Sequence, residues 1–193
     1  MQLWVGLGNP GAQYALQRHN VGFMAADIIA EAHGFSPWSK KFRSLISEGR
    51  IGRHRVLLLK PQTFMNDSGD AVQQAMRFYK LEMDALTVFH DELDLAPFKA
   101  KVKQGGGTAG HNGLRSIDAS LGPDFRRVRI GIGHPGPGRK DLVTPHVLGN
   151  YAKSEMEPLS DLLAAIADEA SWLASGDDAR FMSEVALRMQ QTD

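Results

Sequence analysis

Short apolar runs alternate along this chain with amphipathic segments of helical period, and this alternation constrains the fold more than any other feature. The runs Gln2 to Val5, Leu86 to Phe89 and Val128 to Ile132 predict strands. Apolar residues at helical spacing predict helices within Asn20 to Ala32, Val72 to Tyr79, Leu114 to Leu121, Leu159 to Leu173 and Ala179 to Met189. Strands that alternate with helices predict one α/β domain over residues 1–193, with a mixed twisted β-sheet and helices on both faces.

Three further β-rich segments complete the expected sheet. Leu45 to Ile51 and Arg55 to Lys60 flank Gly52-Arg53, which predicts a hairpin. Phe98 to Lys103 alternates between apolar and basic residues, as a strand with one buried face does. No internal repeat or domain boundary interrupts the sequence.

Composition excludes several classes of protein. Of the 193 residues, 42% are hydrophobic and 23% are charged, which is typical of a folded globular chain. The absence of cysteine excludes disulfides, zinc–thiolate sites and cysteine nucleophiles. No apolar run approaches the roughly 18 residues of a membrane span, and the first residues lack the pattern of a secretory signal. We therefore expect a cytoplasmic protein without membrane association.

Charge is distributed unevenly along the chain, although its formal sum is zero. Residues 1–150 contain 19 Lys and Arg against 13 Asp and Glu, whereas residues 151–193 contain 3 against 9. The first part therefore has a surplus of six positive charges, which is compatible with a basic face for a polyanion and equally with solvated helix surfaces.

Unusual polar residues follow the predicted strands. Asn9, Asn66, Asp91 and His134 each lie just after the end of one. In open α/β sheets, ligands bind outside the carboxyl ends of the strands. We expect these loops to converge on one site.

A glycine motif raises the alternative of a nucleotide-binding enzyme. Gly6-x-Gly8-x-x-Gly11 after a strand matches the dinucleotide fingerprint. However, Pro10 lies inside the turn, and the acidic residues nearest the required spacing, Asp27 and Glu31, lie within a predicted helix and not after a second strand.

A second alternative is a metal-dependent hydrolase. His90-Asp91-Glu92-x-Asp94 could supply imidazole and carboxylate ligands, although one such cluster is more often a solvated loop. The serine motif Gly-x-Ser-x-Gly and the zinc motif His-Glu-x-x-His are both absent.

The remaining chemistry-bearing residues are imidazole, carboxylate and carboxamide groups: His19, Asp91, Asn9, Asn66, Asn112 and His111. Imidazole titrates near neutral pH, so a histidine can remove a proton from water, and a carboxylate on its other nitrogen fixes the tautomer. Carboxamides donate and accept hydrogen bonds without charge, which suits them to a peptide backbone or an oxyanion. This set is sufficient for attack of water on an ester.

Several of these residues belong to longer motifs. The motifs are Val5-Gly6-Leu7-Gly8-Asn9-Pro10-Gly11-x-x-Tyr14, Arg18-His19-Asn20-x-Gly22, Pro61-x-Thr63-Phe64-Met65-Asn66-x-Ser68-Gly69, His90-Asp91-Glu92-Leu93-Asp94-Leu95, Gly110-His111-Asn112-Gly113-Leu114-Arg115-Ser116-Ile117 and Arg129-Ile130-Gly131-Ile132-Gly133. With these motifs the chain resembles bacterial-type peptidyl-tRNA hydrolase from Leu3 to about Gly149.

The resemblance implies hydrolysis of the ester between a peptide and the 3′-terminal ribose of tRNA, which recycles tRNA from aborted translation. It implies that His19 activates water and Asp91 supports it. It also implies that Asn9, Asn66 and Asn112 position the substrate or the water. Tyr14, Phe64, Met65 and His111 resemble cleft walls. No metal or organic cofactor is implied.

The resemblance further implies that Lys103 and Arg129 clamp the 5′-terminal phosphate. The implied partner is thus peptidyl-tRNA, through its acceptor end and 5′ phosphate, and not DNA; we expect a monomer. An RNA-binding relative that has lost catalysis is a third alternative, although His19, Asp91 and Asn9 are all retained.

The sequence departs from the family pattern at three places. Gln17 replaces the usual Thr or Ser, Ala96 and Phe98 replace Pro and Gly, and Thr108-Ala109 interrupts the glycine-rich approach to His111. These departures concern the loops around the cleft and remove no catalytic group.

Overall fold

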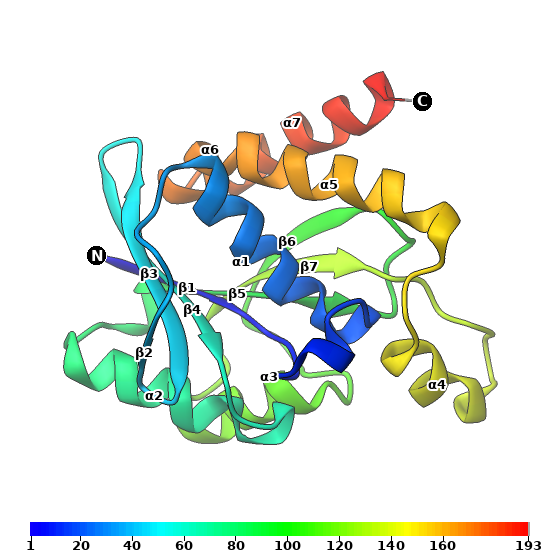
Figure 1. The fold of residues 1–193 in the computed structure, drawn as a ribbon, viewed down its shortest axis with the longest axis horizontal. Coiled ribbons are helices and arrows are strands. Elements are labelled where there is room, and N and C mark those ends of the chain that lie inside the picture. The colour runs from blue at the N-terminus through cyan, green and yellow to red at the C-terminus, as the bar shows by residue number, and fades with distance from the viewer. Residues whose placement is uncertain (193) are drawn as a thin grey trace.

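The computed structural model describes residues 1–192, which form one α/β domain around a seven-stranded mixed sheet (Figure 1). The predicted fold class is confirmed. The strands lie in the order β2-β3-β4-β1-β5-β7-β6. Their bounds are β1 Gln2–Gly6, β2 Ser39–Lys41, β3 Ser44–Ile51, β4 His54–Pro61, β5 Leu86–Glu92, β6 Ala100–Gln104 and β7 Arg126–Gly131.

Strand direction determines where a site can form. β1 is parallel to both β4 and β5, and β5 is parallel to β7. The outer strands β2, β3 and β6 run antiparallel to their neighbours. The carboxyl ends of β1, β4, β5 and β7 therefore meet at one edge of the sheet, where loops can bring side chains from distant parts of the chain together.

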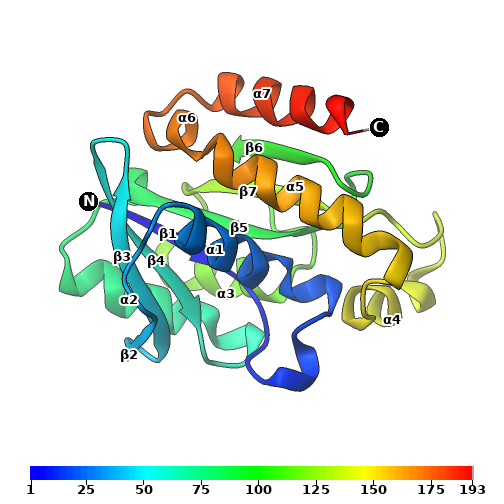
Figure 2. The ribbon, with the colours of Figure 1, turned by 45° about the horizontal axis from the view of Figure 1, so that its top comes forward.

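Helices cover both faces of the sheet (Figure 2). On one face lie α1 (Val21–Ala32), α5 (Met156–Asp168), α6 (Ala170–Ala174) and α7 (Asp178–Gln191); on the other lie α2 (Ser68–Phe78) and α3 (Asn112–Leu121). Successive strand residues point to opposite faces, so Trp4 packs in the core under α1 whereas Leu3 and Val5 pack in the core over α2 and α3. Because both faces are buried, continuous apolar runs occur in the central strands, as in residues 3–5 of β1 and 56–59 of β4.

Close packing of α1 on the sheet requires two glycines. A Cβ on Gly6 would lie 2.2 Å from the carbonyl oxygen of Gly22, and a Cβ on Gly22 would lie 2.4 Å from that of Phe89. The backbone of the first turn is also tied to the sheet, since the N–H of Phe23 donates to the carbonyl of Leu7 at 3.1 Å. These contacts hold the residues just before α1, including His19, at the carboxyl edge of β5.

Some elements differ from the sequence prediction. The helix expected over 159–173 is two helices, because α5 ends at Asp168 and α6 begins at Ala170. β2 was not predicted, because its three residues are all exposed and polar, nor was α4 (Val143–Leu148), which contains Pro145. β5 extends to Glu92, so Asp91 belongs to the strand instead of following it. None of the helices within residues 1–192 has the length and apolar character needed to cross a membrane.

Candidate active site

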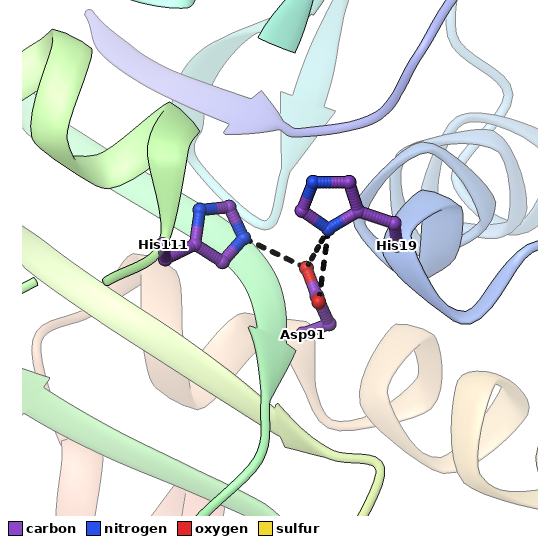
Figure 3. Close-up of side chains that lie close together, drawn as sticks. All are labelled: His19, Asp91 and His111. Carbon is purple, nitrogen blue, oxygen red and sulfur yellow. Dashed lines mark hydrogen bonds and ion pairs between the residues drawn. The ribbon is translucent and has the colours of Figure 1, made fainter. Parts of the chain in front are cut away.

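A buried carboxylate and two imidazoles form the most tightly connected polar cluster at the carboxyl edge of the sheet (Figure 3). Asp91 comes from β5, His19 from the turn before α1, and His111 from the residue before α3. The Nδ1 atom of His19 lies 3.0 and 3.1 Å from the two carboxylate oxygens of Asp91. The Nε2 atom of His111 lies 2.7 Å from Oδ1 of the same carboxylate.

The hydrogen-bond partners determine which ring nitrogens carry protons. The Nδ1 atom of His111 accepts from the backbone N–H groups of Gly113 and Leu114, at 3.1 and 3.3 Å, and so caps α3. Its proton is therefore on Nε2, which donates to Asp91. An ionised Asp91 can only accept, so His19 donates from Nδ1. Its Nε2 atom, on the side of the ring away from Asp91, keeps a free lone pair (Figure 3).

Asp91 is held in its charged form. Burial by itself would raise the pKa of this carboxyl group, since its side chain is only 3% exposed. The electrostatic interactions and hydrogen bonds with His111 and His19 outweigh burial and hold the pKa of Asp91 well below its ordinary value. The site therefore contains a fixed negative charge that stabilises a proton on either imidazole.

Two hollows meet at this cluster. The first, the β5 pocket, has a volume of about 420 Å³ and lies between the end of β5, the loop 108–110 and α4; His19, Asp91, His111, Asn112 and His134 line it. The second, the α3 groove, has a volume of about 920 Å³ and lies along α3; Asn9, His19, Phe64, Met65, Asn66 and Asn112 line it. His19 and Asn112 belong to both, so a substrate could extend in two directions from His19.

The structure brings together most of the predicted site residues. Asn9 is held by Asn20, whose side chain accepts from the N–H of Asn9 at 2.9 Å and donates to its carbonyl at 2.8 Å. Sequence reasoning did not identify this role of Asn20. Tyr14, by contrast, lies in a short 3-10 turn and lines neither hollow.

Helix α4 supplies a wall that the sequence did not indicate. Val143, Thr144, Val147 and Leu148 line the β5 pocket, and Leu148 also lines the α3 groove. The turn that carries His19 is joined to this helix, because Arg18 donates to the carbonyl of His146 at 3.1 Å and pairs with Glu155 at 2.9 Å. The one sequence signal for this helix is the i, i+4 spacing of Val143 and Val147. Pro145 between them obscures that signal, because proline disfavours a helix interior.

The metal-site alternative based on His90-Asp91-Glu92-x-Asp94 is not supported. His90 and Asp91 are successive residues of β5, so their side chains leave opposite faces of the sheet. His90 donates from Nδ1 to the carbonyl of Asp91 at 2.8 Å, and burial, with the nearby His111, lowers its pKa to about 3. The group that does bring potential ligand atoms together is His19, Asp91 and His111, within 4.8 Å of one another. In this group both facing ring nitrogens are hydrogen-bonded to the carboxylate of Asp91, so the three side chains satisfy one another.

The nucleotide-binding alternative is not supported either. After the glycines the chain forms two 3-10 turns, Ala12–Tyr14 and Arg18–Asn20, and α1 begins only at Val21. A dinucleotide site needs the helix N-terminus directly after the glycine turn. Gly6 instead permits the close approach of α1.

The basic residues of β6 and β7 divide into two sets. Lys99, Lys101 and Lys103 are exposed and share one face, as predicted. Arg126, Arg127 and Arg129 do not form one exposed set, because the first two are engaged inside the protein. Arg126 pairs with Asp178 of α7 at 2.8 Å, and Arg127 is buried with its guanidinium on the carbonyl groups of Gly106, Gly107 and Pro123.

Arg129 and Lys103 lie on the same face as diagonal neighbours. In the β6–β7 register, Lys103 is opposite Arg127 and Lys101 is opposite Arg129. Diagonal side chains across a sheet come within reach of a common group. Arg129 also has a carboxylate neighbour, Glu92, at 3.6 Å.

The departures from the family pattern have a structural correlate. Phe98 and Ala109 both adopt positive φ, at 63° and 47°. This left-handed region favours glycine, because a Cβ there crowds the backbone. Gln17 forms an isolated β-bridge with Asn150, and its side-chain oxygen is buried without a hydrogen-bond partner in the described part of the chain.

An open α/β sheet edge that presents an imidazole oriented by a buried carboxylate, beside an amide-lined groove, is typical of a hydrolase that activates water. A model of the family described as peptidyl-tRNA hydrolase matches residues 3–192. The chain belongs to this family.

Individual relatives agree with the family assignment. A peptidyl-tRNA hydrolase of Novosphingobium aromaticivorans is 72% identical over 190 residues, which cover 98% of both chains. One of Rhizorhabdus wittichii is 70% identical over 189 residues, covering 98% of this chain and 99% of the relative. The crystal structure of the peptidyl-tRNA hydrolase of Acinetobacter baumannii superposes with a TM-score of 0.89 at 39% identity, covering 96% of this chain and 94% of that one.

Proposed function

We propose that this chain hydrolyses the ester between a peptide and the 3′-terminal ribose of tRNA, with His19 as the general base. One observation carries the assignment of the base. The Nδ1 atom of His19 is engaged with Asp91 at 3.0 Å, which leaves Nε2 as the basic atom where the β5 pocket and the α3 groove meet. A general base must have this geometry before its pKa matters.

The reaction follows from these positions. A water molecule gives one proton to Nε2 of His19 while its oxygen bonds to the ester carbonyl carbon. The imidazolium that forms is stabilised by the negative charge of Asp91. Asp91 stays ionised, because its pKa is held well below the ordinary value. When the tetrahedral intermediate collapses, the bond to the ribose oxygen breaks and Nε2 returns the proton to that oxygen. The products are a tRNA with an intact terminal ribose and a free peptide carboxylic acid, which ionises by releasing its proton to solvent.

Uncharged amides hold the peptide in this proposal. Asn9, Asn66 and Asn112 offer donors to the developing oxyanion and both donors and acceptors to a peptide bond. Phe64, which is 75% exposed, and Met65, which is buried, both line the groove and supply apolar surface to a substrate. His111 does more than form a wall in this scheme, since it holds Asp91 from the side opposite His19.

The tRNA body would bind outside the two hollows. Lys103 and Arg129, which are diagonal neighbours on one face of β6 and β7, are our candidates for the clamp on the 5′ phosphate. This assignment is supported by the face that the two residues share and by the exposure of Lys103. We further propose that the enzyme acts as a monomer in the cytoplasm, where its substrate arises.

The test uses an N-acetylated aminoacyl-tRNA and the same aminoacyl-tRNA with a free amino group, each incubated with the enzyme while release of the amino acid is followed. We expect rapid release from the acetylated form and slow release from the free form, because an ammonium would enter an amide-lined groove without a carboxylate partner. Equal rates would contradict the role of the amides. Absence of release from the acetylated substrate would contradict the function itself. A parallel reaction with a chelator should proceed at the same rate.

A further inference from the structure

The α3 groove continues beyond the residues used in the proposed reaction. Along α3 its lining follows one helical face, namely Asn112, Arg115, Ser116, Ala119 and Ser120. The spacing i, i+3, i+4, i+7 and i+8 is that of a continuous stripe. At 1.5 Å per residue the stripe is roughly 12 Å long, which corresponds to three or four residues of an extended peptide.

Arg115 is the residue of this stripe with a formal charge. Its side chain is exposed and makes no ion pair or hydrogen bond with any residue in the range 1–192. This differs from Arg18, Arg126 and Arg188, each of which pairs with a carboxylate. No acidic side chain lines the groove within the described residues. A guanidinium without a counter-ion, facing a groove of small and uncharged residues, is available to a ligand.

We propose that Arg115 is a specificity-determining residue that favours peptides with acidic side chains close to the ester. This inference rests on the proposed function, because it assumes that the peptide lies in the α3 groove. Arg115 lies three residues after Asn112, which is roughly 4.5 Å along the helix axis. An extended chain advances about 3.3 Å per residue, so Arg115 reaches the second or third residue from the ester.

Two observations favour the peptide, and not the 3′ end of the tRNA, as the occupant of the α3 groove. Asn9, Asn66 and Asn112 provide the uncharged hydrogen-bonding groups that a peptide backbone needs. The loop 108–110, which follows the strand of Lys103, lines the other hollow, the β5 pocket. The loop that follows Lys103 therefore borders the β5 pocket, whereas Arg115 lines the α3 groove.

The expected preference is modest and depends on salt. An ion pair at an exposed site contributes at most a factor of about five to binding. It weakens as salt screens the charges, since the Debye length is about 8 Å at physiological ionic strength. We expect a two- to fivefold preference for acidic over neutral peptides at low salt and a preference against basic peptides of similar size.

The experiment compares three N-acetylated tripeptidyl-tRNAs that share the esterified residue and the tRNA. The two residues before the ester residue are both Asp, both Asn or both Lys. We expect kcat/KM to fall in that order for the unchanged protein, to become equal for Arg115→Gln, and to reverse for Arg115→Glu. Arg77→Gln, which removes an exposed arginine from α2, is the matched control and should keep the original order.

Each other outcome has a defined meaning. If the unchanged protein hydrolyses all three substrates at equal rates, the proposal is wrong while the proposed function stands. If Arg115→Gln slows all three substrates equally, Arg115 contacts the tRNA and not the peptide, and the proposal is again wrong. If none of the three substrates is hydrolysed, the proposed function fails.

Discussion

The cluster at the end of β5 and the basic face of β6 and β7 lie side by side on one sheet and are built in opposite ways. In the cluster, the side chains of Asp91, His19 and His111 are 3%, 9% and 9% exposed, and each is hydrogen-bonded. On the basic face, Lys103 is exposed and Arg129 is 28% exposed, with Glu92 at 3.6 Å as its nearest carboxylate.

The buried cluster is suited to proton transfer, and the exposed basic face is suited to binding a polyanion. Groups that transfer protons gain from burial, because fixed neighbours and the exclusion of water hold one tautomer and one charge state. Groups that bind a polyanion gain from exposure, since they must reach the phosphates and displace the counter-ions around them. Substitutions in the cluster should therefore affect every substrate, whereas substitutions on the basic face should affect only substrates that contain the tRNA body.

The largest expected effect is that of His19→Ala. Loss of the general base should lower the rate about 10²- to 10⁴-fold, for full peptidyl-tRNA and for a minimal ester of adenosine alike. The fold should persist, because His19 lies in a turn outside both apolar cores, and circular dichroism can verify this. His134→Ala removes another histidine that lines the β5 pocket and serves as the control, with near-normal rates expected. Near-normal turnover by a folded His19→Ala protein would refute the assignment of the base.

A smaller loss is expected for Asp91→Asn. The amide keeps the shape of the side chain but removes the charge that orients and stabilises the imidazole of His19. For metal-binding histidines, loss of the carboxylate that orients the ring costs about 10- to 100-fold in activity, and we expect a loss of that order here. Asp94→Asn, the same change at an exposed residue of the β5 pocket, is the control. If Asp91→Asn matched the unchanged protein from pH 5 to 8, Asp91 would have no part in the reaction.

The third prediction concerns stability against pH. Burial lowers the pKa of His90 to about 3, whereas an unfolded chain has a histidine pKa of about 6.5. Between these values the unfolded state binds a proton that the folded state does not, so stability falls as the pH falls. Asn in place of His90 can donate to the same carbonyl without titrating.

From pH 7 to pH 5 the unchanged protein should therefore lose roughly 2 kcal/mol more unfolding free energy than His90→Asn. Urea unfolding at both pH values measures this difference. Equal losses in the two proteins would show that His90 is not held neutral by the fold.

How much of this could be read from the sequence differs between elements. The central strands and the amphipathic helices were predicted, because burial on one or two faces leaves a clear apolar period. β2 and α4 left no clear apolar period. All three residues of β2 are exposed, and no residue of α4 is fully buried.

The site shows the same division. Asn9, Asn66 and Asp91 could be grouped because strand ends meet at one edge. The contact between His111 and Asp91 could not be predicted, because the two residues are 20 positions apart and the segment between them includes a glycine-rich loop. The course of that loop depends on the buried guanidinium of Arg127, which holds the carbonyl groups of Gly106 and Gly107. The sequence indicated Arg127 only as one more positive charge.

The basic face can be tested against the cluster with Lys103→Ala and Arg129→Ala. Each should weaken the binding of full tRNA substrates and reduce the slope of log affinity against log salt concentration by about 1. Hydrolysis of the minimal adenosine ester should stay nearly unchanged, because His19 and Asp91 are retained. Arg53→Ala, at the β3–β4 turn, removes a similar charge elsewhere as the control. Equal losses on both substrates would mean that these residues support the site and do not clamp a phosphate.

The smallest expected effect lies in the loop that joins the two regions. Ala109 adopts φ of 47° in the loop before His111, where a Cβ is unfavourable by roughly 1 to 2 kcal/mol. Ala109→Gly removes this strain but gives the unfolded chain more freedom, which offsets roughly 0.4 to 1 kcal/mol. We expect a net stabilisation of about 0.5 to 1 kcal/mol, measured by urea unfolding. Thr108, at the neighbouring position, has no positive φ, so Thr108→Gly relieves no strain. It only gives the unfolded chain more conformational freedom, and it should therefore destabilise the protein. If both variants were destabilised equally, the backbone at Ala109 would be unstrained, and alanine in place of glycine at this position would have no cost in stability.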